Sequence, residues 1–315
     1  MRKWIIAAVL FSFSPRAYSW GFLGHKTINE TAVFTVPKPL FGFYKYHLNY
    51  IKEHAPDADK RRYLVEHEAC RHYLDGDHYE QRLPLDTIPK FFQMAVSKYG
   101  EDSVLAHGIV PWYISTMMFQ LTEAFKTKDI QRILKLSADL GHYVGDCHVP
   151  LHSTSNYNGQ KTGQNGIHAL WESRLPEIHS ERYSLFTGLS GYYDQPIDSI
   201  WKAFSESYGL VDSVLLLERV LRSEFSESEI FTWEVRGNLV VKVYTLRFCN
   251  AYNDALNGMV ERRMKAAILC LGSLWYTCWV DAGQPDLPQM PFLPSKDELP
   301  GDIPSEKKML GRQED

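Results

Sequence analysis

Cysteine is scarce in this sequence. Only five cysteines occur, an odd number, and none of their spacings has the C-x2-C form of a zinc ribbon: Cys70, Cys147, Cys249, Cys270 and Cys278. This scarcity excludes a cysteine-rich metal site and predicts that no disulfide framework is essential to the fold. A single bridge such as Cys270 to Cys278 stays open, but small buried thiols are the simpler interpretation.

A basic excess is also lacking. Lys and Arg number 34 against 38 Asp and Glu, so the formal charge is -4. Loss of residues 1–19, which carry three basic and no acidic side chains, would make it -7. This balance excludes a broad basic track for duplex nucleic acid, although bound divalent cations can attract phosphate locally without one.

Long apolar runs are lacking as well. Trp4 to Phe13 forms a run of about ten residues after Arg2 and Lys3, which is too short to cross a bilayer. Ala17-Tyr18-Ser19 then places small residues where a signal peptidase reads them. We expect residues 1–19 to be a signal peptide, with export to the periplasm or the extracellular space and Trp20 as the new first residue. The alternative is a buried amino-terminal helix, against which Pro15 counts.

Strand-like alternation is rare, whereas the helical period recurs. Apolar residues repeat at three- and four-residue steps over 126–145, 211–221 and 252–279. Residues 231–235 and 239–244, around Arg236-Gly237-Asn238, give one hairpin signal. The sequence therefore predicts a mainly α fold, a single multi-helix domain over residues 20–283 with a possible small β-hairpin.

The end of the chain has a different composition. Residues 284–315 contain six prolines among charged residues, and this composition cannot bury enough apolar surface to order itself. We expect a Pro-rich polar tail that is disordered. No feature of the sequence indicates a transmembrane segment or a protein partner.

Residues that bind metals concentrate between positions 142 and 172. His142 and Asp146 are four apart on a predicted helix, so both side chains lie on one face. His168 and Glu172 repeat this step, and His152 lies between the two pairs. One such pair would more often be a surface salt bridge, but the repetition favours a metal site, because imidazole and carboxylate groups suit zinc.

Five motifs occur along the chain in a distinctive order: Trp20-Gly-Phe-Leu-Gly-His25, Ala55-Pro-Asp57, His72-Tyr-Leu-Asp75, His142-x3-Asp146-x5-His152 and His168-x3-Glu172. This order resembles the superfamily that unites bacterial zinc-dependent phospholipase C with the fungal and plant single-strand-specific zinc nucleases. The resemblance extends from residue 20 to about residue 175. It implies a helical domain around a cleft with three zinc ions.

The resemblance also implies which groups bind the three ions: Asp57, His72, His142 and Asp146 the first, His152, His168 and Glu172 the second, and Trp20, through its amino nitrogen and carbonyl oxygen, with His25 and Asp146 the third. Asp146 would bridge two ions. Asp59 remains a substitute for Asp57 as a ligand, and Asp57 is also the expected helper that orients the attacking water. Metal coordination lowers the pKa of water towards ~7, so a hydroxide could attack phosphorus in line.

The substrate is less clearly indicated than the reaction. Tyr73 and Asp75 could stack on and hydrogen-bond to a base, and Asn156 lies in the polar loop 153–166, which we expect to border the substrate. Because the Trp20-Gly-x2-Gly-His25 start, Asp146-x-His-x-Pro-Leu-His152 and His168-Ala-Leu-Trp-Glu172 resemble the nuclease branch, we lean to a single-strand nuclease or 3′-nucleotidase-like activity on a phosphodiester.

Two alternatives stay open. One is a zinc-dependent phospholipase C that releases phosphorylated headgroups, since Val149 and Glu172 depart from the usual nuclease pattern and the glutamate matches the phospholipases. The other is a non-catalytic zinc-binding surface protein.

Overall fold

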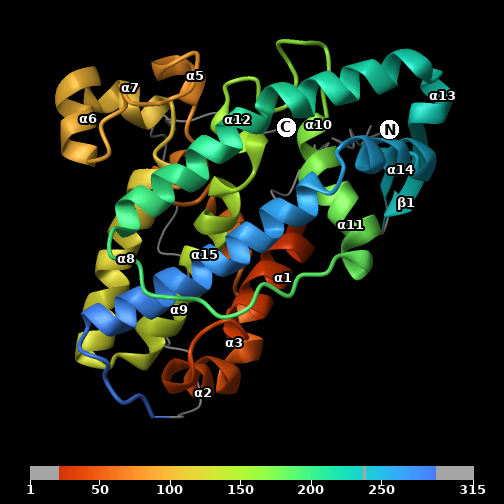
Figure 1. The fold of residues 1–315 in the computed structure, drawn as a ribbon. Helices are drawn as coiled ribbons and strands as arrows, with labels where there is room; N and C mark the ends of the chain where they lie inside the picture. The colour runs from red at the N-terminus through yellow and green to blue at the C-terminus, as the bar shows by residue number, and fades with distance from the viewer. Residues whose placement is uncertain (1–20, 237–238, 289–315) are drawn as a thin grey trace, which may run out of the picture.

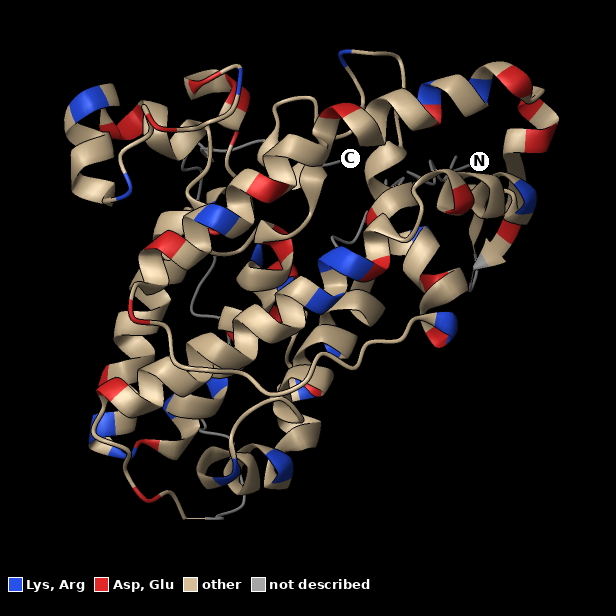
Figure 2. Ribbon diagram, in the orientation of Figure 1, with Lys and Arg blue, Asp and Glu red and all other residues tan. Residues whose placement is uncertain are grey.

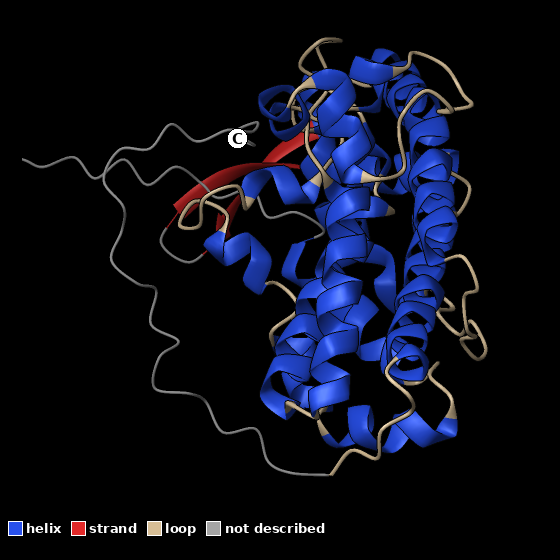
Figure 3. Ribbon diagram, turned by 90° about the vertical axis from the view of Figure 1, so that its left-hand side faces the viewer, coloured by secondary structure: helices blue, strands red, loops and turns tan. Residues whose placement is uncertain are grey.

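The computed structural model describes residues 21–236 and 239–288 and is built almost wholly of helices (Figures 1 and 3). The predicted mainly α fold is confirmed. The expected signal peptide, Trp20, the hairpin turn at 237–238 and most of the expected tail lie outside the described residues. No described helix is both long and apolar enough to cross a membrane.

The first half of the chain alternates short helices with two long ones: α1 (Gly21–Val33), α2 (Lys38–Tyr46), α3 (Leu48–Glu53), α4 (Asp57–Arg61), η1 (Ala69–His72), α5 (Gly76–Tyr79), α6 (Phe92–Tyr99), α7 (Glu101–Ala106), α8 (Val110–Thr127) and α9 (Ile130–Cys147). The expected helix over 126–145 is α9, which begins later than predicted. Lys128, with a φ of 55°, ends α8, and the side chain of Asp129 accepts a hydrogen bond from the backbone N–H of Arg132.

The second half holds short helical segments, two further long helices and the hairpin: η2 (Pro150–Ser153), α10 (Ile167–Ala169), η3 (Leu170–Arg174), α11 (Leu175–His179), η4 (Ser180–Arg182), α12 (Pro196–Glu224), α13 (Glu227–Ile230), β1 (Phe231–Arg236), β2 (Leu239–Tyr244), α14 (Leu246–Ala255) and α15 (Met259–Asp281). The predicted helix over 252–279 is divided. Asn257 and Gly258 both have positive φ, and a left-handed pair of residues cannot continue a helix.

Helix α9 lies at the centre of the fold. It packs against α1, α3, α8 and α15, and every residue from Leu136 to Cys147 is buried. Gly141 permits the close approach of α1, because a Cβ there would lie 1.9 Å from Oδ1 of Asn29. The Asn29 amide donates to the carbonyls of Ala138 and Ile51, and so joins α1, α9 and α3.

The predicted hairpin is confirmed. Strands β1 and β2 pair antiparallel, with Phe231 opposite Tyr244, Trp233 opposite Lys242 and Val235 opposite Val240. In Figure 3 the two strands lie at one side of the helical body. Residues directly opposite each other project from the same face of a ribbon, so these six side chains share one face.

Candidate metal centre

The described residues contain three groups of side chains whose ligand atoms lie within 4.8 Å of one another: His25, Asp59 and His142; His72, His142 and Asp146; and His152, His168 and Glu172. They come from seven elements, namely α1, α4, η1, α9, η2, α10 and η3. Each group combines imidazole with carboxylate, the donor set that zinc prefers. The centre can therefore hold metal ions.

Asp146 directs its two oxygens at different groups. Oδ2 is 2.9 Å from Nδ1 of His72 and 3.3 Å from Nε2 of His142. Oδ1 is 3.5 Å from Nε2 of His25 and 4.0 Å from Nε2 of His152. A carboxylate with this placement can bind one cation through each oxygen.

Two histidines are fixed in the tautomer that a metal requires. Nδ1 of His142 donates to the carbonyl of Ala55 at 3.0 Å, and Nδ1 of His152 donates to the carbonyl of His72 at 2.6 Å. With the proton on Nδ1, each ring keeps the lone pair of Nε2 for a metal. Both Nε2 atoms face the carboxylates of the centre.

Two of the three members of the third group lie on one helical turn. His168 and Glu172 are four residues apart, and Nε2 of His168 is 3.1 Å from Oε2 of Glu172. Nε2 of His152 lies at the same distance from that oxygen. Burial alone would raise the pKa of Glu172, but the charges of His168 and His152 outweigh it and lower the pKa. The carboxylate is thus held as an anion, ready to bind a cation.

The electrostatics around His142 favour positive charge. Burial alone would lower the pKa of His142, yet Asp146 and Asp59 outweigh it and raise the pKa well above the usual value. Burial would likewise raise the pKa of Asp146, but His142 and His152 hold it well below the usual range. A place that binds a proton so firmly between carboxylates suits a divalent ion.

His25 is a neutral imidazole, so one of its ring nitrogens keeps a lone pair that can bind a metal ion. Burial, to which the charge of His142 adds, lowers the pKa of His25 to about 3. Among the described residues, neither ring nitrogen of His25 has a hydrogen-bond partner, and its ring stacks on His142 with the centroids 3.8 Å apart. A buried imidazole in this position is available to bind a metal ion.

Asp59 takes the place that the sequence motif assigned to Asp57. Oδ1 of Asp59 is 3.5 Å from Nε2 of His142 and 3.7 Å from Nδ1 of His72. The Asp57 carboxylate pairs instead with His54 and Lys60, both at 2.6 Å. The structure therefore brings Asp59 and not Asp57 to the centre. The two residues are two positions apart on helix α4, so their side chains point in directions about 200° apart around the helix axis.

The two residues expected to stack on and hydrogen-bond to a base, Tyr73 and Asp75, are both buried. Tyr73 is fully buried, and its hydroxyl donates to the carbonyl of Ala106. Asp75 is nearly buried and lies 3.3 Å from Nδ1 of His107. A ring without an exposed face cannot stack on a base in this conformation.

Asn156 also acts within its own loop. Its amide donates to Oγ1 of Thr162, and its carbonyl oxygen accepts from the backbone N–H of Lys161. The neighbouring Tyr157 is the residue that contacts the centre, with its ring edge-on to His168 at 6.0 Å. Nothing in the sequence singles out Tyr157 beyond its place in a polar loop.

The five cysteines are all buried free thiols, as the simpler interpretation of the sequence had it. Burial raises the pKa of Cys70 and Cys249 to about 11. These thiols are protonated at neutral pH and belong to the core rather than to the metal centre.

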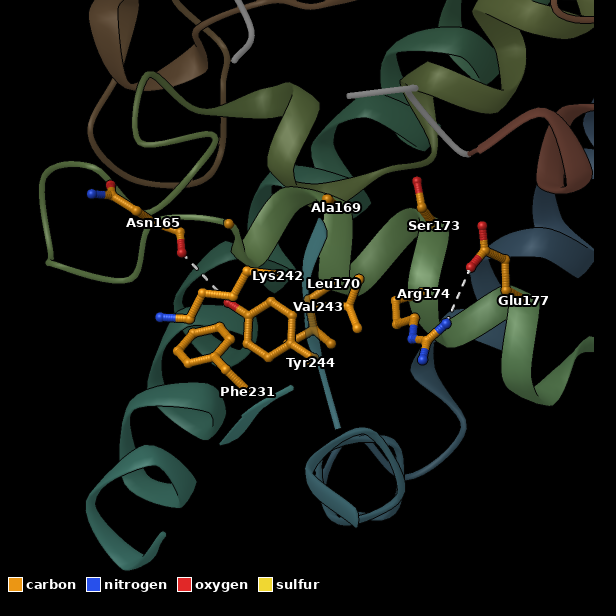
Figure 4. A pocket seen from close by; sticks show the side chains of 11 residues that line it. Asn165, Ala169, Leu170, Ser173, Arg174, Glu177, Phe231, Lys242, Val243 and Tyr244 are labelled. Carbon is orange, nitrogen blue, oxygen red and sulfur yellow. Dashed lines mark hydrogen bonds and ion pairs between the residues drawn. The ribbon is translucent and has the colours of Figure 1, made fainter. Parts of the chain in front are cut away.

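A pocket of about 360 Å³ opens between η3, α11 and the hairpin (Figure 4). Leu170, Phe231 and Tyr244 give it apolar walls, while Lys242 and Arg174 lie at its two sides. Ala169 and Ser173, which also line it, each follow a residue of the third metal-ligand group in the chain. The segment that supplies His168 and Glu172 to the metal centre thus also forms one wall of this pocket.

No family model matches the chain, and no curated protein matches it in sequence. Among solved structures, it is similar to the alpha-toxin of an avian strain of Clostridium perfringens, with 11% identity and a TM-score of 0.46 over 86% of this chain. The alpha toxin of Clostridium absonum gives 11% identity and a TM-score of 0.46 over 84%. The chain spans 65% of the length of each toxin.

Proposed function

We propose that the protein is an exported zinc-dependent hydrolase of phosphate esters. The observation that carries this proposal is the placement of Asp146, whose two oxygens face different groups of buried histidines. A structural zinc site closes four ligands around one ion, whereas a shared carboxylate holds neighbouring ions close together, as two-metal hydrolases require.

When bound, zinc ions supply a nucleophile at neutral pH and offset the charge that develops on the phosphate oxygens. The chain's own residues fix the geometry. His142 and His152 keep their protons on Nδ1, and the fully buried Asp146 stays ionised between them. Oδ2 of Asp59 has no hydrogen-bond partner among the described residues, so it can accept a proton from an attacking water. Asp59 thus takes over the role expected of Asp57.

Among substrates, the geometry favours a phospholipid over a nucleic acid. The apolar pocket beside η3 continues along the ribbon face that carries Trp233, Val235 and Val240, which are 67%, 76% and 64% exposed. An acyl chain fits such a surface. We therefore favour the phospholipase alternative over the nuclease, since Tyr73, expected to stack on a base, has no exposed surface.

The distribution of charge points the same way. Acidic and basic residues intermingle along the helices of Figure 2, and the described residues show no basic track. At the pocket, Lys242 pairs with Glu227 and Arg174 with Glu234. A long single strand would need several unpaired cations along its backbone.

A substrate panel tests the proposal. The protein beginning at Trp20 should release phosphorylated headgroups from phosphatidylcholine vesicles in a zinc-dependent way, with slower turnover of single-stranded DNA, RNA and 3′-nucleotides. Faster turnover of the nucleic acids or nucleotides would favour the nuclease hypothesis instead. If zinc-loaded protein turned over none of these four substrates, the hypothesis of a non-catalytic zinc-binding protein would be favoured.

The third zinc of the proposal requires the amino terminus. A free α-amino group has a pKa of about 7.7 to 8.0, so zinc can displace its proton, whereas an amide nitrogen has no such lone pair. Protein with one extra Gly before Trp20 should keep the ions held by His72, His142, His152 and His168 and lose the third. Equal zinc content and turnover with and without the Gly would refute the amino-terminal ligand.

A further inference from the structure

Behind the metal centre lies a buried network of charged and phenolic side chains on the side of His72 remote from Asp146: Arg61, Glu68, Arg71, Asp139 and Tyr143. Glu68 is the member nearest the centre. It is fully buried, it precedes His72 by four residues, and its Oε1 lies 3.9 Å from Nε2 of His72.

The two nitrogens of His72 have different surroundings. Nδ1 faces the metal centre, 3.0 Å from Nε2 of His142 and 2.9 Å from Oδ2 of Asp146. Nε2 points the other way and, among the described residues, has no hydrogen-bond partner. An imidazole that binds a metal through one nitrogen carries its proton on the other, and that N–H needs an acceptor.

Glu68 is held in place as such an acceptor. Nη1 of Arg71 donates to Oε2 at 2.7 Å, Nε of Arg61 is 3.3 Å from Oε1, and the Tyr143 hydroxyl donates to Oε1. Removing a carboxylate from water costs several kcal/mol unless partners such as these compensate. Tyr143 directly follows His142 in α9, so the network links the supports of two metal ligands.

We propose that Glu68 is a positioning residue for the metal centre, which accepts the Nε2–H of His72 when a zinc ion occupies Nδ1. The contact fixes the ring orientation and makes His72 a stronger donor. A shift of about 1 Å brings the 3.9 Å separation into hydrogen-bond range. This inference depends on the proposed function only because that function identifies the bound metal ion as zinc.

Metal affinity tests the inference without an activity assay. Zinc-free wild-type protein and a Glu68→Gln variant would be titrated with zinc against a chromophoric chelator, and with cobalt while its visible absorption is recorded. We expect one of the ions to bind about 10 to 100 times more weakly in the variant. The cobalt spectrum should change because the geometry at His72 relaxes.

Asp139→Asn is the matched control. Asp139 pairs with Arg61 at 3.0 Å in the same buried network, but no contact joins it to His72. We expect this variant to lose stability and keep wild-type metal affinity. Wild-type affinity and spectrum in Glu68→Gln, or an equal loss in Asp139→Asn, would overturn the inference.

Two further outcomes are distinguishable. If Glu68→Gln does not fold, Glu68→Asp replaces it, because it keeps the charge but withdraws it from His72 by one methylene, and the same loss is expected. If wild-type protein binds no zinc at all, the proposed function fails rather than the role of Glu68 alone.

Discussion

Asp146 is the residue on which the metal centre depends most. It is fully buried, it lies between the histidines of all three groups, and each of its oxygens faces a different set. An asparagine at this position would be neutral, and it would offer one oxygen where the carboxylate offers two. A single atom change thereby affects two ions.

The Asp146→Asn variant should consequently lose about two zincs per chain, more than any other single-ligand variant, and its activity should fall by orders of magnitude. Elemental analysis after dialysis measures the loss. Wild-type zinc content in this variant would show that Asp146 does not bridge.

Asp57 and Asp59 provide a matched pair two residues apart. Asp59→Asn should weaken zinc binding and reduce activity, because its carboxylate lies beside His72 and His142. Asp57→Asn should keep zinc and activity and lose only the exposed contacts with His54 and Lys60, worth about 1 kcal/mol or less. The reverse result would return the role to Asp57.

At this scale the sequence could predict most of the centre and not its details. The four-residue steps indicated His142, Asp146, His168 and Glu172 because both members of each pair share a helix face. The choice between Asp57 and Asp59 depends on how α4 is rotated against α9, which no local pattern records. Glu68 stands at the same four-residue step from His72, but the sequence does not single it out, because an acid three residues before Arg71 is typical of an ordinary surface ion pair.

Among the elements, α9 contributes most, since it carries two candidate ligands and packs against helices that include α1, α3, α8 and α15. Its glycines permit close contacts with α1. A Cβ on Gly145 would lie 3.1 Å from Nδ1 of His25, and one on Gly141 would overlap Asn29. The metal centre thus requires small residues on this helix as well as ligands.

A Gly141→Ala substitution should destabilise the protein by about 3 kcal/mol, since it displaces the Asn29 amide from two carbonyls and outweighs the gain in helix propensity. Urea unfolding of the zinc-free protein measures this. Gly191→Ala, whose Cβ would have no heavy atom within 4 Å, is the control and should change stability by less than about 0.5 kcal/mol. Equal stabilities would contradict the packing argument.

The junction of α2 and α3 should be sensitive to acid. Burial lowers the pKa of His47, whose ring lies against Phe43 and Tyr46. The unfolded chain therefore binds more protons below about pH 6.5, and the free energy of unfolding should fall as the pH drops from 6.5 towards the folded-state pKa. His47→Gln should reduce this slope by up to one proton in chelator-treated protein. An unchanged slope would mean that His47 titrates normally.

The helix boundaries show where local patterns end. The expected helix over 211–221 is the middle of α12, which extends from Pro196 to Glu224. The same three- and four-residue period extends back through Phe204 and Ile200, which are buried, so the helix begins well before the predicted range. The hairpin, by contrast, was predictable from turn residues between two β-branched runs.

At the scale of the whole molecule, the metal centre joins segments that are distant in the sequence. Ligand groups come from positions 25 to 172, and they meet around the buried last part of α9, which carries His142 and Asp146. Ions bound there would connect α1, α4 and η1 to η2, α10 and η3. Since only the folded chain assembles these ligands, metal binding and folding are thermodynamically linked.

The proposed zinc-dependent hydrolysis is best tested by zinc titration of metal-free protein beginning at Trp20, with phosphoester turnover followed at each addition. We expect no turnover without metal, and activity that rises to a plateau at about three zincs per chain. Full activity in excess chelator after dialysis would contradict it, as would a protein that binds three zincs and hydrolyses no phosphate ester.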